Sequence, residues 1–224
     1  MMKLSEKTLT VLKNFTTINQ GLSIKSGNTI RTISKQQNVL ARATVPDSFS
    51  ADAVIFDLNR FLGVVTSLDN PDVDINATEK KIVIKSGVYK TVYGLSDESM
   101  IVAPPAKDLK VEKAEVNFSL TKDSFNQVMK LSGIMSLPNI AVVGNGKKIT
   151  FETSNVKDNE SDTFSVDVGD TTDKFKFIFN TENMKMIPGD YSVAISSKGI
   201  AHFKSTTDPI EYWVATESGG YYGE

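Results

Sequence analysis

Residues 5–15, SEKTLTVLKNF, and residues 121–131, TKDSFNQVMKL, share one pattern of polar and apolar positions. Apolar residues recur in both at the spacing of one helix face, at an offset of 116 residues: Leu9, Leu12 and Phe15, then Phe125, Val128 and Leu131. A hydroxyl residue, Ser5 or Thr121, stands where an N-cap side chain accepts a hydrogen bond from an unsatisfied helix amide. The repeat predicts two similar domains, each with an amphipathic helix near its start.

The segments after these helices repeat as well. Glycine and asparagine at residues 27–28 and 144–146 tolerate turn geometry between strand-like runs, which predicts a hairpin after each helix. Residues 56–61 and 179–184 stand 123 residues apart, and strand-like runs follow both. Because two short helices cannot cover two extended sheets, we expect an α+β fold in which helices cover one sheet face and strand edges stay open.

The stretch APPAKD at residues 103–108 separates the two halves. Proline donates no backbone hydrogen bond and favours an extended chain, so this composition is typical of a connector. We therefore predict an N-terminal domain with its connector at residues 1–110 and a C-terminal domain at residues 111–224.

Composition excludes several function classes. The 224 residues include no Cys and one His, which excludes disulfides, thiol catalysis and metal sites built on two histidines. No apolar run has the length of a membrane span, and Met1 to Leu12 lacks the apolar core of a secretory signal. We expect a cytoplasmic protein that is not an enzyme and that uses no metal or cofactor.

Three motifs that could suggest chemistry favour structural roles instead. Residues 144–148, GNGKK, lack the spacing of a phosphate loop and read as a turn. Residues 69–74 hold three aspartates, but Pro71 interrupts the register and the loop glycine of a calcium site is missing. His202 lies in a strand-like run with no second His or Cys to share a metal.

The outer faces of the predicted helices are polar and mildly basic. Helices are predicted at residues 5–18, 51–67, 122–135 and, briefly, 181–186. A solvated surface with lysines for solubility explains such faces as well as a binding role does, so spacing alone leaves both interpretations open.

Three stretches resemble the DNA polymerase sliding clamps of T-even-type bacteriophages. These are LKNF at residues 12–15 with Thr17-Ile18-Asn19, DLN at residues 57–59 with Phe61-Leu62-Gly63, and NMKM at residues 183–186 with Pro188-Gly189 and Tyr191. The resemblance implies two domains of the DNA-clamp type that associate head to tail into a homotrimeric ring, with helices lining the inside and β-sheets outside. It implies sequence-independent binding of duplex DNA and a ring that tethers the replicative polymerase for processivity.

On this resemblance, each group of residues has an expected role. Residues on the helix faces and near them would face DNA: Lys3, Lys7, Lys13, Asn14, Arg60, Lys122, Lys130 and Lys185. Two strand edges would form the subunit interface: Tyr89 and Tyr93 on one side, and Asp162, Phe164 and Val166 on the other. A pocket near the connector and the C-terminal strands would receive a partner peptide: Val111, Ile200, Tyr212 and Trp213.

The implied partners are the C-terminal peptide of the polymerase, an ATP-dependent clamp loader and late-transcription proteins, in the cytoplasm of an infected bacterial host. The charges of the two halves are complementary, as head-to-tail closure requires. Residues 1–110 hold 14 Lys and Arg against 11 Asp and Glu, whereas residues 111–224 hold 11 Lys and Arg against 16 Asp and Glu. Chance asymmetry is the alternative. A β-rich phage structural protein and a small hydrolase using Asp72 and Asp74 remain as other function classes.

Overall fold

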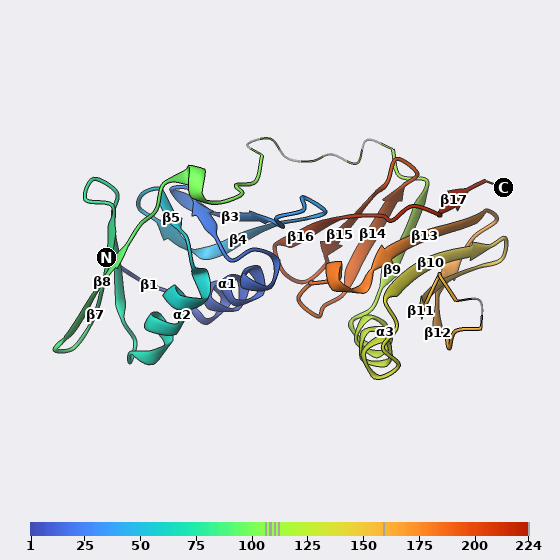
Figure 1. Cartoon of the computed structure of the whole chain (residues 1–224), viewed down its shortest axis with the longest axis horizontal. Helices are drawn as coiled ribbons and strands as arrows, with labels where there is room; N and C mark the ends of the chain where they lie inside the picture. Colours follow the sequence, from blue (N-terminus) through green and yellow to red (C-terminus); the bar gives the residue numbers. More distant parts are fainter. Residues whose placement is uncertain (106, 108, 110, 112, 159, 224) are drawn as a thin grey trace. The chain divides into compact units, whose positions relative to one another are not determined.

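The computed structural model describes residues 1–105, 107, 109, 111, 113–158 and 160–223 (Figure 1). Contacts divide the chain into two compact units, Met1–Lys107 and Asp108–Glu224, and each is considered by itself. Ala106, Asp108 and Lys110 of the predicted connector lie outside the described residues, so the boundary after residue 110 stays a prediction.

The first unit contains two helices and two antiparallel sets of strands. Its elements in chain order are β1 (Met2–Lys3), α1 (Glu6–Ile18), β2 (Leu22–Ile24), β3 (Gly27–Ile33), β4 (Val39–Phe49), β5 (Ala53–Ile55), α2 (Leu58–Ser67), β6 (Asp72–Asn76), β7 (Lys81–Ser86), β8 (Tyr89–Gly94) and the 3₁₀ turn η1 (Glu98–Met100). Strands β5, β2, β3 and β4 pair in that order, as do β1, β6, β7 and β8. In the second set β8 is the terminal strand.

The second unit repeats this order of elements. It consists of β9 (Val116–Leu120), α3 (Lys122–Ile134), β10 (Asn139–Asn145), β11 (Lys148–Ser154), β12 (Phe164–Asp170), β13 (Lys174–Asn180), the 3₁₀ turn η2 (Thr181–Asn183), β14 (Tyr191–Ser196), β15 (Ile200–Ser205), β16 (Ile210–Ala215) and β17 (Tyr221–Tyr222). Strands β12, β11, β10, β13 and β17 pair in that order, and so do β9, β14, β15 and β16. The prediction of two similar α+β domains is confirmed.

Local sequence explains where α1 and α3 begin. Ser5 and Thr121 have extended backbones, and their hydroxyls accept hydrogen bonds from the amides of Thr8 and Ser124. Apolar residues on the inner face of each helix are buried: Leu12, Phe15 and Ile18 in α1, and Phe125 and Val128 in α3. The helix α1 packs on β3, β4 and α2, while α3 packs on β11 and β12. Each helix therefore leaves its polar face in solvent.

The predicted helix at residues 51–67 is wrong in its first half. Ala53–Ile55 forms β5, whose residues pair with Leu22–Ile24 of β2, and α2 begins only at Leu58. The Asp57 carboxylate accepts a 2.9 Å hydrogen bond from the amide of Arg60 and so caps α2. Pairing with β2 satisfies the backbone of Ala53–Ile55, and the Asp57 cap fixes a later helix start.

The predicted helix at residues 181–186 is reduced to η2. The Asn180 side chain accepts from the amide of Glu182 and starts the turn, but Pro188 disfavours helical geometry at the residue before it. Met184 and Met186 are both buried and fill the core below η2.

The C-terminal segment adds an edge strand to the second unit. Tyr221 and Tyr222 of β17 pair with β13, and the ring of Tyr222 stacks on Phe175 at a centroid distance of 6.2 Å. The Tyr222 hydroxyl donates a 3.0 Å hydrogen bond to Asp173. This segment therefore covers the outer edge of β13.

Candidate nucleic-acid interface

Three of the predicted DNA-facing cations of the first unit are exposed on its helices. Lys7 and Lys13 are exposed on α1, Lys13 opposite its buried residues and Lys7 at the edge of the buried face, and Asn14 next to Lys13 is half-buried. Lys3 is exposed on β1 and therefore belongs to a strand. Arg60 is exposed in the first turn of α2.

The second unit presents fewer cations on its single long helix. Lys122 is the first residue of α3 and Lys130 lies two turns later, and both are exposed. Lys185 is half-buried in the segment after η2, so the loss of the predicted helix places it on a loop. Flexible lysines with exposed ammonium groups attract phosphates as diffuse charges and read no base edges. Such faces suit sequence-independent contact with a duplex.

The two predicted interface strands are both terminal strands of their sheets. Tyr89 begins β8 with 67% of its surface exposed, whereas Tyr93 is half-buried and its ring lies edge-on to Phe61 at 5.6 Å. On β12, Phe164 and Val166 are half-buried, and Asp162 just before the strand is exposed. Unpaired backbone groups on such strands can pair with another chain.

Sequence analysis missed two exposed apolar side chains beside Tyr89. Val88, in the turn between β7 and β8, is 93% exposed, and Val92 on β8 is 55% exposed. No periodicity signals them, because an alternating strand pattern does not reveal whether its outer face is covered.

Two of the four predicted pocket residues are core residues instead. Tyr212 has no exposed surface, and its hydroxyl accepts a 3.1 Å hydrogen bond from the amide of Ile187. Burial raises the pKa of the Tyr212 hydroxyl far above its usual range. Trp213 is only 4% exposed, whereas Val111 and Ile200 are half-buried. Tyr212 and Trp213 lie on opposite faces of β16, and because both side chains are covered, neither offers surface to a docked peptide in this structure.

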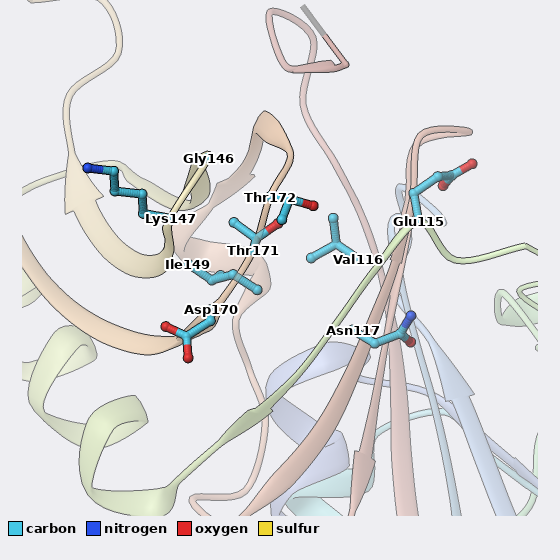
Figure 2. A pocket seen from close by; sticks show the side chains of 9 residues that line it. All are labelled: Glu115, Val116, Asn117, Gly146, Lys147, Ile149, Asp170, Thr171 and Thr172. Atoms are coloured by element: carbon cyan, nitrogen blue, oxygen red, sulfur yellow. The ribbon is translucent and has the colours of Figure 1, made fainter.

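Cavities lie elsewhere in the described parts of the chain. In the first unit, Lys35, Phe56, Met100, Ile101 and Val102 contribute to a cavity of about 220 Å³ where the chain leaves η1. In the second unit, a cavity of about 780 Å³ opens between the start of β9 and the turns that end β10 and β12 (Figure 2). Sequence analysis identified Gly146 and Lys147 of its lining only as turn residues and predicted no cavity here.

Metal-binding clusters and membrane-spanning helices are two features that the described residues do not show. Within the described residues, no cluster of three or more His, Cys, Asp or Glu side chains is arranged to hold a metal ion. No helix in those same residues combines the length and apolar character needed to cross a membrane.

Solved structures share this fold. PCNA of A. fulgidus, solved with the C-terminal region of FEN-1, has a TM-score of 0.67 at 13% identity, covering 93% of this chain and 94% of that chain. The DNA polymerase III subunit beta of Pseudomonas aeruginosa also gives 0.67 at 13% identity, covering 96% of this chain and 64% of that chain. At such low identity the likeness shows the fold alone, which is of the clamp type.

Similarity in sequence identifies the family more specifically than similarity in fold. The family described as DNA polymerase processivity factor matches residues 3–103, and the family described as gp45 sliding clamp, C terminal, matches residues 117–218. The sliding clamp of Vibrio phage KVP40 is 32% identical over 224 residues, covering 97% of this chain and 100% of that protein. The sliding clamp of Enterobacteria phage T4 is 32% identical over 203 residues, covering 88% of this chain and 89% of that protein. These matches do not favour a structural protein or a hydrolase; the chain belongs to the sliding clamps of T4-like phages, non-enzymatic processivity factors of phage DNA polymerase.

Proposed function

We propose that three copies of this chain close head to tail into a ring around duplex DNA, with β8 of one subunit pairing with β12 of the next. The observation that supports this most is the charge of the two terminal strands and their surroundings. Residues 80–94 contain Lys80, Lys81, Lys85 and Lys90 and no acid. Residues 158–173 contain no Lys or Arg and six acids: Asp158, Glu160, Asp162, Asp167, Asp170 and Asp173.

Opposite charge on two open edges favours pairing between the edges over pairing of either edge with itself. In an antiparallel pairing, Tyr93 would meet Val166 of the next subunit, and Phe164 and Tyr89 would lie at opposite ends of the contact. The contact is heterologous, so a closed ring forms only if the rotation between neighbours completes a circle.

The duplex would pass through the ring beside Lys7, Lys13, Arg60, Lys122 and Lys130, with Lys3, Asn14 and Lys185 nearby. Contacts with phosphates alone give binding that falls steeply with salt and permits sliding. A closed ring leaves DNA by opening or by running off an end. A bound polymerase thereby gains effective concentration at the primer terminus.

Partners of the ring are part of the same proposal. A C-terminal peptide of the polymerase would dock near the connector, beside Val111 and Ile200 or in the cavity lined by Ile101 and Val102; a fold neighbour, A. fulgidus PCNA, is bound to the C-terminal region of FEN-1. An ATP-dependent loader would place the ring on DNA, and late-transcription proteins would use it there. All of this would take place in the cytoplasm of the infected bacterial host.

Sedimentation across a dilution series tests ring formation. The chain mass is 24.5 kDa, so a species of three chains that dissociates on dilution, and more readily at high salt, is the expected result. A monomer at every concentration and salt would overturn the proposal. Retention on circular DNA with loss on linearisation, after loading, tests topological linkage.

A further inference from the structure

The turn between β7 and β8 holds an apolar side chain that the chain itself does not cover. Ser86 and Tyr89 pair across the turn, so Gly87 and Val88 are its two central residues. Gly87 has a φ of +56°, which a two-residue hairpin turn with glycine at its first central position requires. Val88 is 93% exposed, the largest exposed fraction among the large apolar side chains of the described residues.

Two further side chains with apolar surface are exposed on β8, on opposite faces of the strand. Tyr89 is 67% exposed and Val92 is 55% exposed. Lys85 and Lys90 are directly opposite each other in the β7–β8 register, and both are exposed. Like charges at opposite positions repel, so this hairpin tip gains from a partner surface that is apolar at its centre and acidic at its rim.

The cavity of about 780 Å³ in the second unit has that character. Val116 and Ile149, each 3% exposed, form its apolar floor, and Figure 2 shows their side chains directed toward the same space as those of Thr171 and Thr172. A cavity of this volume is in the range that holds a drug-sized ligand, so the side chain of one valine fits within it.

Two acidic side chains, Glu115 and Asp170, line the same cavity. Glu115 is held in place because its carboxylate accepts hydrogen bonds from the amide and hydroxyl of Ser197, at 2.8 and 3.1 Å. Asp170 binds the Lys148 ammonium at 2.7 Å. Asp167 and Asp173 are exposed on either side of Asp170 along the chain. The lining therefore includes two acids and one cation, Lys147, while Asp167 and Asp173 add negative charge on the neighbouring chain.

Strand direction brings the tip and the cavity together. Every strand pair within the two units is antiparallel: β1–β6, β6–β7, β7–β8, β2–β3, β2–β5, β3–β4, β9–β14, β14–β15, β15–β16, β10–β11, β10–β13, β11–β12 and β13–β17. If β8 pairs with β12 of a second copy in the same direction, and the two strands overlap along their lengths, the first residue of β8, Tyr89, lies beside the last residue of β12, Asp170. Gly87 and Val88 then extend past Asp170 to Thr171 and Thr172, which line the cavity.

We infer that the β7–β8 turn of one subunit inserts Val88 into the cavity floored by Val116 and Ile149 of the next subunit. This contact, here called the lock, stabilises the interface between subunits of the ring. The inference rests on the proposed head-to-tail ring and adds to it a specific contact beyond strand pairing. Lys85 and Lys90 flank the inserted turn and meet the acids in and beside the cavity lining.

Disulfide cross-linking tests the contact directly, because the chain contains no cysteine of its own. A double variant with Val88→Cys and Thr172→Cys is expected to form disulfide-linked dimers and trimers on mild oxidation, since two cysteines bridge only when their Cα atoms lie within about 7 Å. The matched control combines Val88→Cys with Thr163→Cys, which replaces an exposed threonine at the other end of β12. That control is expected to stay unlinked.

Each outcome separates the lock from the ring. Linkage through residue 163 in place of residue 172 would overturn the antiparallel arrangement. No linkage in either variant, with wild-type protein sedimenting as three chains, would overturn the lock and leave the ring. A wild-type monomer under all conditions would overturn the proposed ring itself.

The affinity between subunits provides a second test of the Val88 contact. Val88→Ser is expected to raise the subunit dissociation constant roughly tenfold or more, because the serine side chain buries far less apolar surface in the cavity. The control is Ile134→Ser, which removes another apolar side chain, 67% exposed at the end of α3. It should leave the constant unchanged, and equal constants for both variants would count against the lock.

Discussion

The hydroxyl of Tyr93 donates a 2.8 Å hydrogen bond to the carbonyl oxygen of Asp57. This bond ties the terminal strand β8 to the residue that caps α2. The Asp57 side chain meanwhile binds the amide of Arg60, so a proposed subunit edge and a proposed DNA-facing cation share one anchor. Burial raises the pKa of the Tyr93 hydroxyl, which keeps it protonated as a donor.

Replacement of Tyr93 by Phe removes that bond and retains the ring packed on Phe61. We expect the free energy of unfolding to fall by about 1 kcal/mol, because the Asp57 carbonyl loses its donor in a half-buried site. Urea unfolding measures the change. Tyr89→Phe serves as the control, since Tyr89 is 67% exposed, and it should change stability by less than about 0.5 kcal/mol. Equal effects would show that the bond contributes nothing.

The Asp47 carboxylate makes the start of α1 sensitive to acid. It accepts hydrogen bonds from the Ser5 amide at 2.7 Å and the Ser5 hydroxyl at 2.8 Å. Burial raises the pKa of this carboxyl, but hydrogen bonds from Thr8 and Ser5 outweigh that effect, and the pKa is lowered overall.

A folded-state pKa below the unfolded value gives stability that is present above the unfolded pKa and is lost as pH falls through the folded pKa. Asp47→Asn should therefore be less stable than wild type at neutral pH, with the difference shrinking below the usual range of an aspartate. Urea unfolding at a series of pH values measures it. A difference that stays constant down to strongly acid pH would contradict the assignment.

Charge removal on the helix faces and at Lys185 tests the DNA-facing set. The variant replaces five cations by Ala: Lys7, Lys13, Arg60, Lys130 and Lys185. We expect trimer mass to be unchanged and the salt slope of DNA association to fall by roughly one for each phosphate that the variant no longer binds. Binding is measured between low and moderate salt.

The control for this variant removes the same number of charges away from the helix faces. It replaces five other exposed cations by Ala: Lys25, Lys157, Lys174, Lys198 and Lys204. Net charge then changes equally in both variants. An equal decrease of slope in both would mean that overall charge, and not the helix faces, governs DNA association.

Gly220 allows the C-terminal segment to lie against β13. A Cβ atom at this position would stand 2.6 Å from the carbonyl oxygen of Lys176, closer than backbone atoms tolerate. Gly220→Ala should therefore detach β17, expose Phe175 and speed proteolysis of the last residues. Limited proteolysis followed by mass spectrometry measures the rate. Ser218→Ala introduces no such clash and should be cleaved at the wild-type rate; identical rates for both would rule out the steric argument.

Local sequence determined the parts of this protein that depend on neighbours along the chain. The helices α1 and α3 begin where Ser5 and Thr121 can cap them, because capping and helical periodicity act within one or two turns. The repeat between halves was readable for the same reason. Three motifs quoted from the sequence also indicated the sliding-clamp family without any spatial information.

Tertiary structure alone decided which apolar residues are covered. Ala53–Ile55 became a strand because β2 lies beside it, although its pattern continues that of α2. Tyr212 is buried and Val88 is exposed, although both stand in strand-like surroundings. Burial depends on which elements pack against a residue, and those elements are distant in sequence. For that reason the cavity beside Thr171 and Thr172 could be found only in the folded chain.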